Sequence, residues 1–136
     1  MTIKGIGKYR GTKKISFYIF FAGSGTEDKP YLIETTDDWN VFAEITNNGE
    51  TYAGKYFELI NDLDFRNDSS VFSIVSNGNN YFAGIFDGNN HSFNGVVTSD
   101  GIFKKLDTNG IIKNLTVKNS TMTGSTEVGG IVGLNK

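Results

Sequence analysis

Short apolar runs, separated by turns rich in asparagine and glycine, fill most of this 136-residue chain. The runs occupy residues 56–60, 71–75, 81–86, 92–97, 111–117 and 127–134. Phenylalanine, isoleucine, valine and tyrosine suit pleated strands, whereas glycine and asparagine tolerate the positive φ of tight corners. Strands this short do not hold a sheet together alone. The pattern therefore predicts an all-β fold in which short strands stack on one another.

One segment has helical instead of strand periodicity. Thr35 and Asp38 fit a capping box, and Trp39 and Phe42 then fall on one helical face before an Asn-Asn-Gly stop. We expect a helix near residues 36–47. A single short amphipathic helix ahead of a long β region is well suited to cover an apolar end that would otherwise face water, so we interpret it as a cap.

Internal similarity gives a loose period. Residues 93–96 align with 112–115 at an offset of 19, and residues 101–103 align with 130–132 at an offset of 29. Loose periods of this size are typical of β-solenoids, whose strands are constant in length and whose corner loops vary. A β-sandwich has strands of similar length, so periodicity alone leaves both folds open.

Five sequence blocks, in their order and spacing, resemble the GLUG-motif β-helix proteins of bacteria. The blocks lie at 25–33, 54–64, 82–93, 112–115 and 128–133. The resemblance implies a right-handed parallel β-helix, a solenoid, with an N-terminal capping α-helix. Residues 101–104 and Leu134 depart from the family pattern, and we expect both to lie at coil corners.

The β-helix interpretation assigns individual residues. Those given a structural role in the motif are Trp39, Gly84, Phe86, Asp87, Gly88, His91, Asn114, Leu115, Gly129, Gly130 and Gly133. Those expected to point into the coil are Phe57, Leu59, Phe82, Phe86, Phe93, Val96, Ile112, Leu115 and Ile131.

Composition excludes several function classes. The formal net charge is −2 and the basic residues cluster only at the extreme N-terminus, which argues against nucleic-acid binding. The chain has no cysteine and one histidine, which removes disulfides, thiolate zinc sites, cysteine nucleophiles and multi-histidine metal sites. We expect no cofactor and no bound metal.

Two groups of residues are candidates for catalysis. Asp62 and Asp64 alternate on one strand, so both point to the same face, where they could serve a polysaccharide hydrolase or lyase, or bind calcium. We favour the simpler interpretation, in which they flank an inward Leu63 on a solvated face. His91 stands in a turn and suits a hydrogen bond across a corner better than catalysis. Asp87, before Gly88, suits a turn in which its side chain bonds the backbone.

Aromatic side chains offer a second option for binding. Tyr31, Trp39, Tyr52, Tyr56 and Tyr81 could form a surface on which carbohydrate stacks. We favour a structural interpretation, in which Trp39 packs the helix onto the core and the tyrosines lie at the boundary between core and water.

These observations favour a non-catalytic structural or binding module of a secreted or cell-surface, adhesin-like protein. Its partners would be an extracellular ligand, such as a carbohydrate or a host protein, and further β-helix coils or a second copy of itself. Two alternatives stay open: a fragment of a polysaccharide-active β-helix enzyme, and a non-catalytic region of a large secreted metallopeptidase. The zinc motif His-Glu-x-x-His is absent from this chain, so the resemblance transfers no protease chemistry to it.

Two segments define the expected organisation. Residues 1–24 read as a signal peptide or leader, with a strand of a preceding domain or an imperfect gene start as the alternatives. The apolar run at 15–22 is too short to span a membrane. Residues 25–136 would form the cap and first coils, and the apolar strand just before residue 136 leads us to expect further coils or self-association there.

The leader makes a testable prediction. If it is cleaved on export, the mature protein begins between Gly23 and Thr26 and is found outside the cytoplasm. N-terminal sequencing of secreted material from the native host measures this. Recovery of intact Met1 from the cytosol would contradict export by this segment.

Overall fold

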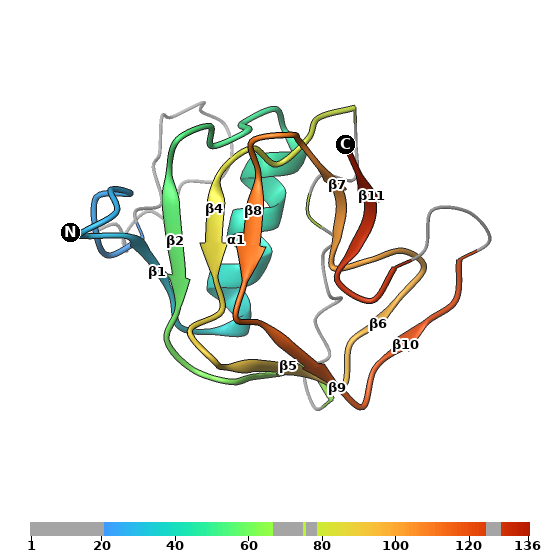
Figure 1. Cartoon of the computed structure of the whole chain (residues 1–136). Helices are drawn as coiled ribbons and strands as arrows, with labels where there is room; N and C mark the ends of the chain where they lie inside the picture. Colours follow the sequence, from blue (N-terminus) through green and yellow to red (C-terminus); the bar gives the residue numbers. More distant parts are fainter. Residues whose placement is uncertain (1–20, 67–74, 76–78, 125–128) are drawn as a thin grey trace, which may run out of the picture.

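Eleven short strands and one helix make up the part of the chain that the computed structural model describes, residues 21–66, 75, 79–124 and 129–136 (Figure 1). The first elements are β1 (Tyr31–Ile33), α1 (Thr36–Asn47), β2 (Tyr56–Leu59), β3 (Leu63–Asp64), β4 (Ile85–Asp87) and β5 (Ser92–Asn94). The remaining ones are β6 (Val97–Thr98), β7 (Phe103–Leu106), β8 (Ile111–Lys113), β9 (Thr116–Lys118), β10 (Thr121–Met122) and β11 (Val132–Asn135).

The strands form four small parallel sheets. Their orders are β1-β2-β4-β8, β3-β5-β9, β6-β10 and β7-β11. Every pairing between these strands is parallel, as we expected for stacked strands. Residues 85–106 contribute one strand to each of the four sheets in turn. Residues 111–135 contribute a second series of strands to the same sheets in the same order.

Paired strands lie 24 to 30 residues apart along the chain. Phe57 pairs with Tyr31 on one side and with Phe86 on the other, and Phe86 pairs with Ile112. The 29-residue alignment is confirmed, because Phe103 pairs with Val132.

The 19-residue alignment is wrong. Phe93 pairs with Val117, and Ile112 belongs to a different sheet. The apolar run at 111–117 is two strands, because Asn114 adopts a φ of +54° and turns the chain between β8 and β9. The alignment therefore matched segments from different sheets.

Two other apolar runs are also divided. Phe82 makes only an isolated bridge to Leu106, and β4 begins at Ile85. Gly95, with a φ of +75°, separates β5 from β6. Of the run at 71–75, only Val75 lies within the described residues.

The two departures from the family pattern lie partly in strands, although Gly101 and Ile102 precede β7 and Ile102 is in a bend. Phe103 and Lys104 are in β7, and Leu134 is in β11. The expectation of corner positions is therefore wrong for them.

The helix begins and ends as its sequence predicts. The Asp38 N–H donates to Thr35 Oγ1 at 3.1 Å, and the Thr35 N–H donates to Asp38 Oδ2 at 3.0 Å, which completes the capping box. Gly49 follows the helix with a φ of +120°, a conformation that glycine adopts without steric cost.

Aromatic rings from the helix and the sheets form the core. Trp39 and Phe42 are fully buried. The Trp39 ring lies 5.7 Å from Phe86, 4.7 Å from Phe93 and 5.5 Å from Phe103, between ring centroids. Figure 1 shows α1 behind β4 and β8 of the sheet β1-β2-β4-β8, with β7 and β11 farther to the right. The helix thus covers apolar side chains of several strands at once.

Most of the predicted inward residues are buried. The fully or almost fully buried ones are Phe57, Leu59, Phe82, Phe86, Phe93 and Val96. The others, Ile112, Leu115 and Ile131, are half-buried and pack against the same core. They belong to the segment 111–135, whose strands have a neighbour on one side only.

The helix contact can be tested by removing the Trp39 side chain. Trp39→Ala leaves a cavity among three aromatic rings, and we expect it to lower the free energy of unfolding by about 3–5 kcal/mol. Urea denaturation followed by circular dichroism measures the change. The control is Glu44→Ala on the exposed face of α1, which should change stability by less than about 0.5 kcal/mol. A loss below about 1 kcal/mol for Trp39→Ala would contradict the core assignment.

Candidate functional site

Three of the motif residues, Asp87, Gly88 and Asn114, meet at the corner between β4 and β5, where Asp87 is the central acceptor. Its Oδ1 accepts the Asn89 N–H at 2.8 Å and the Asn114 side-chain amide at 2.9 Å. Lys113 Nζ lies 3.4 Å from its Oδ2. Partial burial acts to raise the pKa of Asp87, but the hydrogen bonds from Asn114 and Asn89 and the nearby Lys113 outweigh it and lower the pKa. Asp87 therefore bonds its own turn, as predicted, and also connects that turn to the turn that follows β8.

Glycines in this motif allow close backbone approach. A Cβ on Gly88 would lie 2.6 Å from the Asn114 carbonyl oxygen, and a Cβ on Gly84 would lie 2.7 Å from the Tyr52 carbonyl oxygen. Any larger residue would push the stacked segments apart at both places. Leu115, the neighbour of Asn114, is half-buried against the core.

The glycines near the end of the chain differ among themselves. A Cβ on Gly129 would collide with the Val132 carbonyl oxygen, whereas a Cβ on Gly130 would meet nothing within 4 Å. A Cβ on Gly101 would lie 2.8 Å from the backbone nitrogen of Gly133 on the adjacent strand. The motif glycines Gly129 and Gly133 thus lie at tight backbone contacts, and Gly130 does not.

His91 contacts an acidic residue of the neighbouring strand segment. Its Nδ1 lies 3.3 Å from Asp62 Oδ1, which also accepts the Ser92 N–H at 2.8 Å. The hydrogen bond from the Ser92 backbone is the main cause that lowers the pKa of Asp62, with smaller contributions from His91 and Lys118. The contact joins two corners that lie about 30 residues apart in the sequence, as expected for a bond across a corner.

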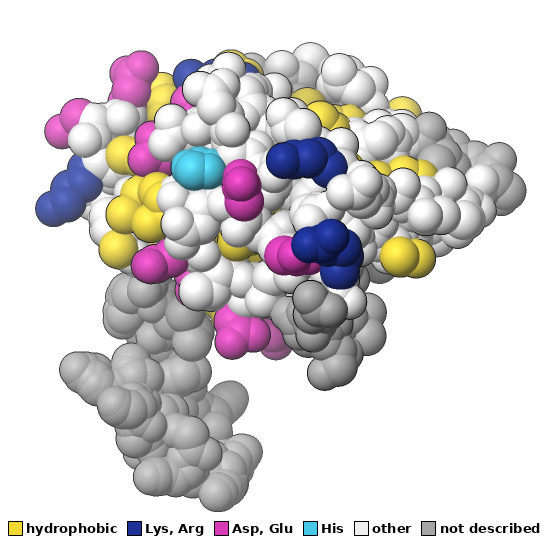
Figure 2. All heavy atoms as spheres, turned by 90° about the horizontal axis from the view of Figure 1, so that it is seen from below, with side chains coloured by type: hydrophobic (Ala, Val, Ile, Leu, Met, Phe, Trp, Pro, Cys, Tyr) yellow, Lys and Arg dark blue, Asp and Glu magenta, His cyan; other side chains and the backbone are white. Residues whose placement is uncertain are grey.

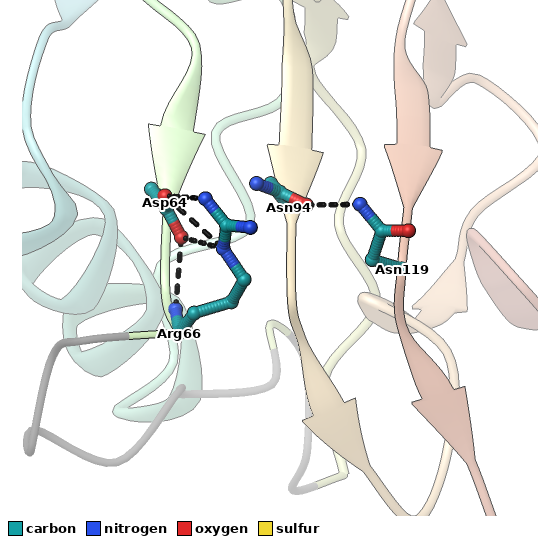
Figure 3. A network of polar contacts seen from close by, with 4 residues as sticks. All are labelled: Asp64, Arg66, Asn94 and Asn119. Atoms are coloured by element: carbon teal, nitrogen blue, oxygen red, sulfur yellow. Dashed lines mark hydrogen bonds and ion pairs between the residues drawn. The ribbon is translucent and has the colours of Figure 1, made fainter.

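Asp64 is held by Arg66, which our sequence reasoning missed (Figure 3). Asp64 Oδ1 accepts Arg66 Nε–H at 2.9 Å, and its Oδ2 accepts Nη2–H at 2.6 Å. These bonds, with one from the Arg66 backbone, lower the pKa of Asp64 to about 2. An arginine two residues after an aspartate was the signal that could have indicated this pair.

An amide pair beside Asp64 was also missed. Asn119 donates its side-chain amide to Asn94 Oδ1 at 2.8 Å, and Figure 3 shows the two side chains in line across neighbouring strands. Asn94 is the last residue of β5 and Asn119 directly follows β9, 25 residues later in the sequence. That spacing, close to the pairing distance of the sheets, was available in the sequence.

The two candidate carboxylates lack the properties of an acid–base pair. A glycosidase needs one carboxylic acid whose pKa is raised so that it is protonated when substrate binds. The pKa values of Asp62 and Asp64 are both lowered. Across the described residues, no group of three or more histidine and acidic side chains is arranged to hold a metal ion.

The five aromatic residues do not form a common stacking surface. Trp39 is buried, and the rings of Tyr31 and Tyr52 pack on Phe57 at 5.2 and 4.8 Å. Tyr56 instead lines a groove of about 90 Å³ with Glu27, Pro30, Glu58, Ile85, Asp87 and Lys113. This volume is far below the roughly 300 Å³ of ordinary small-molecule sites. Lys136 Nζ lies over the Tyr81 ring at 4.5 Å from the centroid.

The outer surface has no region of a single charge over β5 and β9. Figure 2 shows this face, where acidic, basic and uncharged polar side chains alternate and the histidine lies beside an acidic group. In the part of the chain that the structure describes, the exposed large apolar residues are Val97 and Ile111. Among the helices of the described chain, none has the length and apolar character needed to cross a membrane.

The chain is similar to short parts of two long proteins. It is 33% identical over 128 residues to halomucin of Haloquadratum walsbyi, an alignment that covers 85% of this chain and 1% of halomucin. It is 25% identical over 127 residues to a protein of Evansella cellulosilytica described as a Gly-rich membrane protein, covering 85% of this chain and 14% of the relative. No known family pattern matches the chain, and no solved structure matches it. The chain therefore spans only a small share of either relative.

The Asp64–Arg66 pair predicts a specific pH dependence. The folded pKa of Asp64, about 2, lies below its ordinary value of 3.8, so this carboxylate contributes stability above pH 3.8 that is lost as the pH falls through about 2. Arg66→Gln should raise the Asp64 pKa toward 3.8 and weaken this part of the acid dependence. A carboxyl titration by NMR measures the pKa directly.

The control for that titration is Lys104→Gln, because Lys104 pairs with Asp100 and not with Asp64. It should leave the Asp64 midpoint unchanged. An Asp64 midpoint that stays near 2 in Arg66→Gln would show that another group holds the carboxylate.

Proposed function

We propose that this chain is a non-catalytic structural module of a cell-surface or secreted protein, built as the capped end and first coils of a right-handed parallel β-helix. The carrying observation is the repeated order of the sheets. Residues 85–106 and 111–135 pass through the same four parallel sheets in the same sequence, one stacked on the other. Such stacking is the defining arrangement of a solenoid, in which each coil contacts its neighbours.

The helix supports a capping role in this proposal. It lies between β1 and β2 in the chain, in the place where a first coil would otherwise continue. Its buried face, which contains Trp39 and Phe42, packs against aromatic side chains of β2, β4, β5 and β7. A core closed in this way keeps apolar side chains and strand edges from water.

The relatives support a place at the cell surface. One is named halomucin and the other is described as a membrane protein, names that fit a surface location. We include in the proposal the likeness to GLUG-motif proteins, which rests on the five sequence blocks. The partners would be an extracellular ligand, such as a carbohydrate or a host protein, and further coils or a second copy.

The acidic residues favour a structural function over catalysis. Asp62, Asp64 and Asp87 each accept hydrogen bonds from neighbouring groups, and the pKa of each is lowered. Ionised carboxylates held by fixed donors connect stacked segments but do not supply the proton that glycoside cleavage needs. A non-catalytic region of a longer secreted enzyme would look the same and would also satisfy this proposal.

Two measurements test the proposal together. Antibodies against residues 25–136 should label intact cells of the native host without permeabilisation. The purified chain should show no turnover on a panel of polysaccharides, with Asp62→Asn/Asp64→Asn as the matched variant. Labelling only after permeabilisation would overturn the surface location. Cleavage that disappears in the double variant would overturn the non-catalytic function.

A further inference from the structure

We infer that the outer edges of β8, β9, β10 and β11 form one interaction surface, which accepts a further coil of parallel strands with asparagine or glycine at two corners. We call it the terminal edge. The inference rests on the β-helix architecture proposed above and adds to it the identity and chemistry of what binds there.

Among the described residues, the terminal edge consists of strand edges that pair with no further strand. Each of the four strands is the last in its sheet. The N–H groups of Ile111, Thr116 and Thr121 donate to the carbonyls of the residues just before β4, β5 and β6, at 3.0, 3.2 and 2.8 Å. Alternate residues of a strand bond to opposite neighbours, so the backbone groups of the intervening residues face the open side. These residues are Ile112, Val117 and Met122.

The same three side chains show an incomplete core. Ile112, Val117 and Met122 pack against the core but stay half-buried. Phe86 and Phe93, which pair with Ile112 and Val117 on the neighbouring strands, are fully buried. A further coil would cover the half-buried side chains and pair the backbone groups beside them, which removes apolar area from water.

A side-chain amide adds a polar requirement. Asn119 donates its amide N–H to Asn94 Oδ1 at 2.8 Å, and Figure 3 shows its carbonyl oxygen directed away from Asn94. A coil placed on the terminal edge would meet this acceptor. A hydrogen-bond donor at the matching corner, such as another asparagine, would satisfy it.

Backbone conformation at two corners defines the sequence of the binding coil. Asn90 and Asn114 have φ values of +65° and +54°, and the Asn90 N–H donates to the Asn114 carbonyl. At the next corner Gly95 and Asn119 have φ values of +75° and +49°. Within each segment the two corner residues are five apart, so the next coil should carry Asn or Gly at two positions with this spacing.

The terminal edge fits a coil joined in cis better than a second copy. At the opposite end the outer strands of the four sheets are β1, β3, β6 and β7. The far edge of β7 is already bridged there by Val75 and Phe82, so a second copy does not present four open strands. Lys136 N–H donates to the Leu106 carbonyl at 3.0 Å. The backbone at Lys136 therefore stands over the start of the turn that leads from β7 to β8.

The test extends the chain by a second copy of residues 107–136 placed directly after Lys136. Hydrogen exchange of the Ile112, Val117 and Met122 amides should slow by about tenfold or more, because these amides become paired. The matched control carries the same extension with its copies of Asn114 and Asn119 replaced by valine. We expect the control to lose most of this protection, because valine does not adopt the left-handed corner conformation.

The outcomes separate this inference from the architecture on which it rests. Fast exchange of Ile111 and Thr116 in the unextended chain would overturn the stacked-coil arrangement itself. Protected Ile111 and Thr116, with Ile112 and Val117 unchanged by the extension, would overturn only the terminal edge as a coil-binding surface.

Aggregation of the extended chain and self-association of the unextended chain are tested separately. If the extended chain aggregates, a free peptide of residues 107–136 is added to the unextended chain. Slower exchange of the Ile112 and Val117 amides would then support the inference. Unchanged exchange of these amides would overturn it. Sedimentation of the unextended chain gives the oligomeric state. A dimer that protects the same amides would show that a second copy occupies the surface, which contradicts a coil in cis.

Discussion

The packing of α1 onto stacked aromatic side chains is the contact on which the rest of this structure depends. The strands are two to four residues long, and strands of this length do not form a stable sheet by themselves. Trp39 and Phe42 lie against Phe86 and Phe103, which come from two different sheets. The aromatic side chains of the helix therefore connect strands that belong to different sheets. The capping box determines where the helix begins.

Polar residues stabilise the corners as the aromatic rings stabilise the interior. Asp87 bonds Asn114, Asn119 bonds Asn94, and Asp62 contacts His91, each across neighbouring stacked segments. Left-handed asparagines and glycines let the chain turn sharply between sheets without a long loop. The length of the segments between strands varies, yet the order of the sheets stays constant because the corners repeat.

The hydrogen bonds of the polar residues at the corners also bear on function. The acidic residues that would be candidates for catalysis in a polysaccharide-active enzyme are used here as hydrogen-bond acceptors for corner groups. The groove lined by Tyr56 is small, and the face that Figure 2 shows carries mixed charges. A molecule of this kind is suited to act through its shape, its outer faces and its stacking, which agrees with the non-catalytic surface module that we propose.

Local features of the sequence determined the helix, the strand-rich fold and most of the interior. The helix at 36–47 followed from a capping box and a 3.6-residue period, which depend on neighbours within a few residues. The burial of Phe57, Phe86 and Phe93 was predicted from the β-helix interpretation, which places the apolar side chains of short strands inside. The 29-residue offset between Phe103 and Val132 was also visible, because both strands follow a glycine-containing segment.

Only the tertiary structure decided the register and the partners at the corners. The 19-residue alignment matched real sequence similarity but joined strands of two sheets, because Asn114 divides one apolar run between them. The Asp62–His91 and Asn94–Asn119 contacts join residues 29 and 25 positions apart. Parallel pairing brings such residues together only after each corner has turned, and the corners of residues 85–106 and 111–135 differ in length. A sequence specifies which residues can turn the chain, whereas the stacking of the parallel strands decides which side chains then meet.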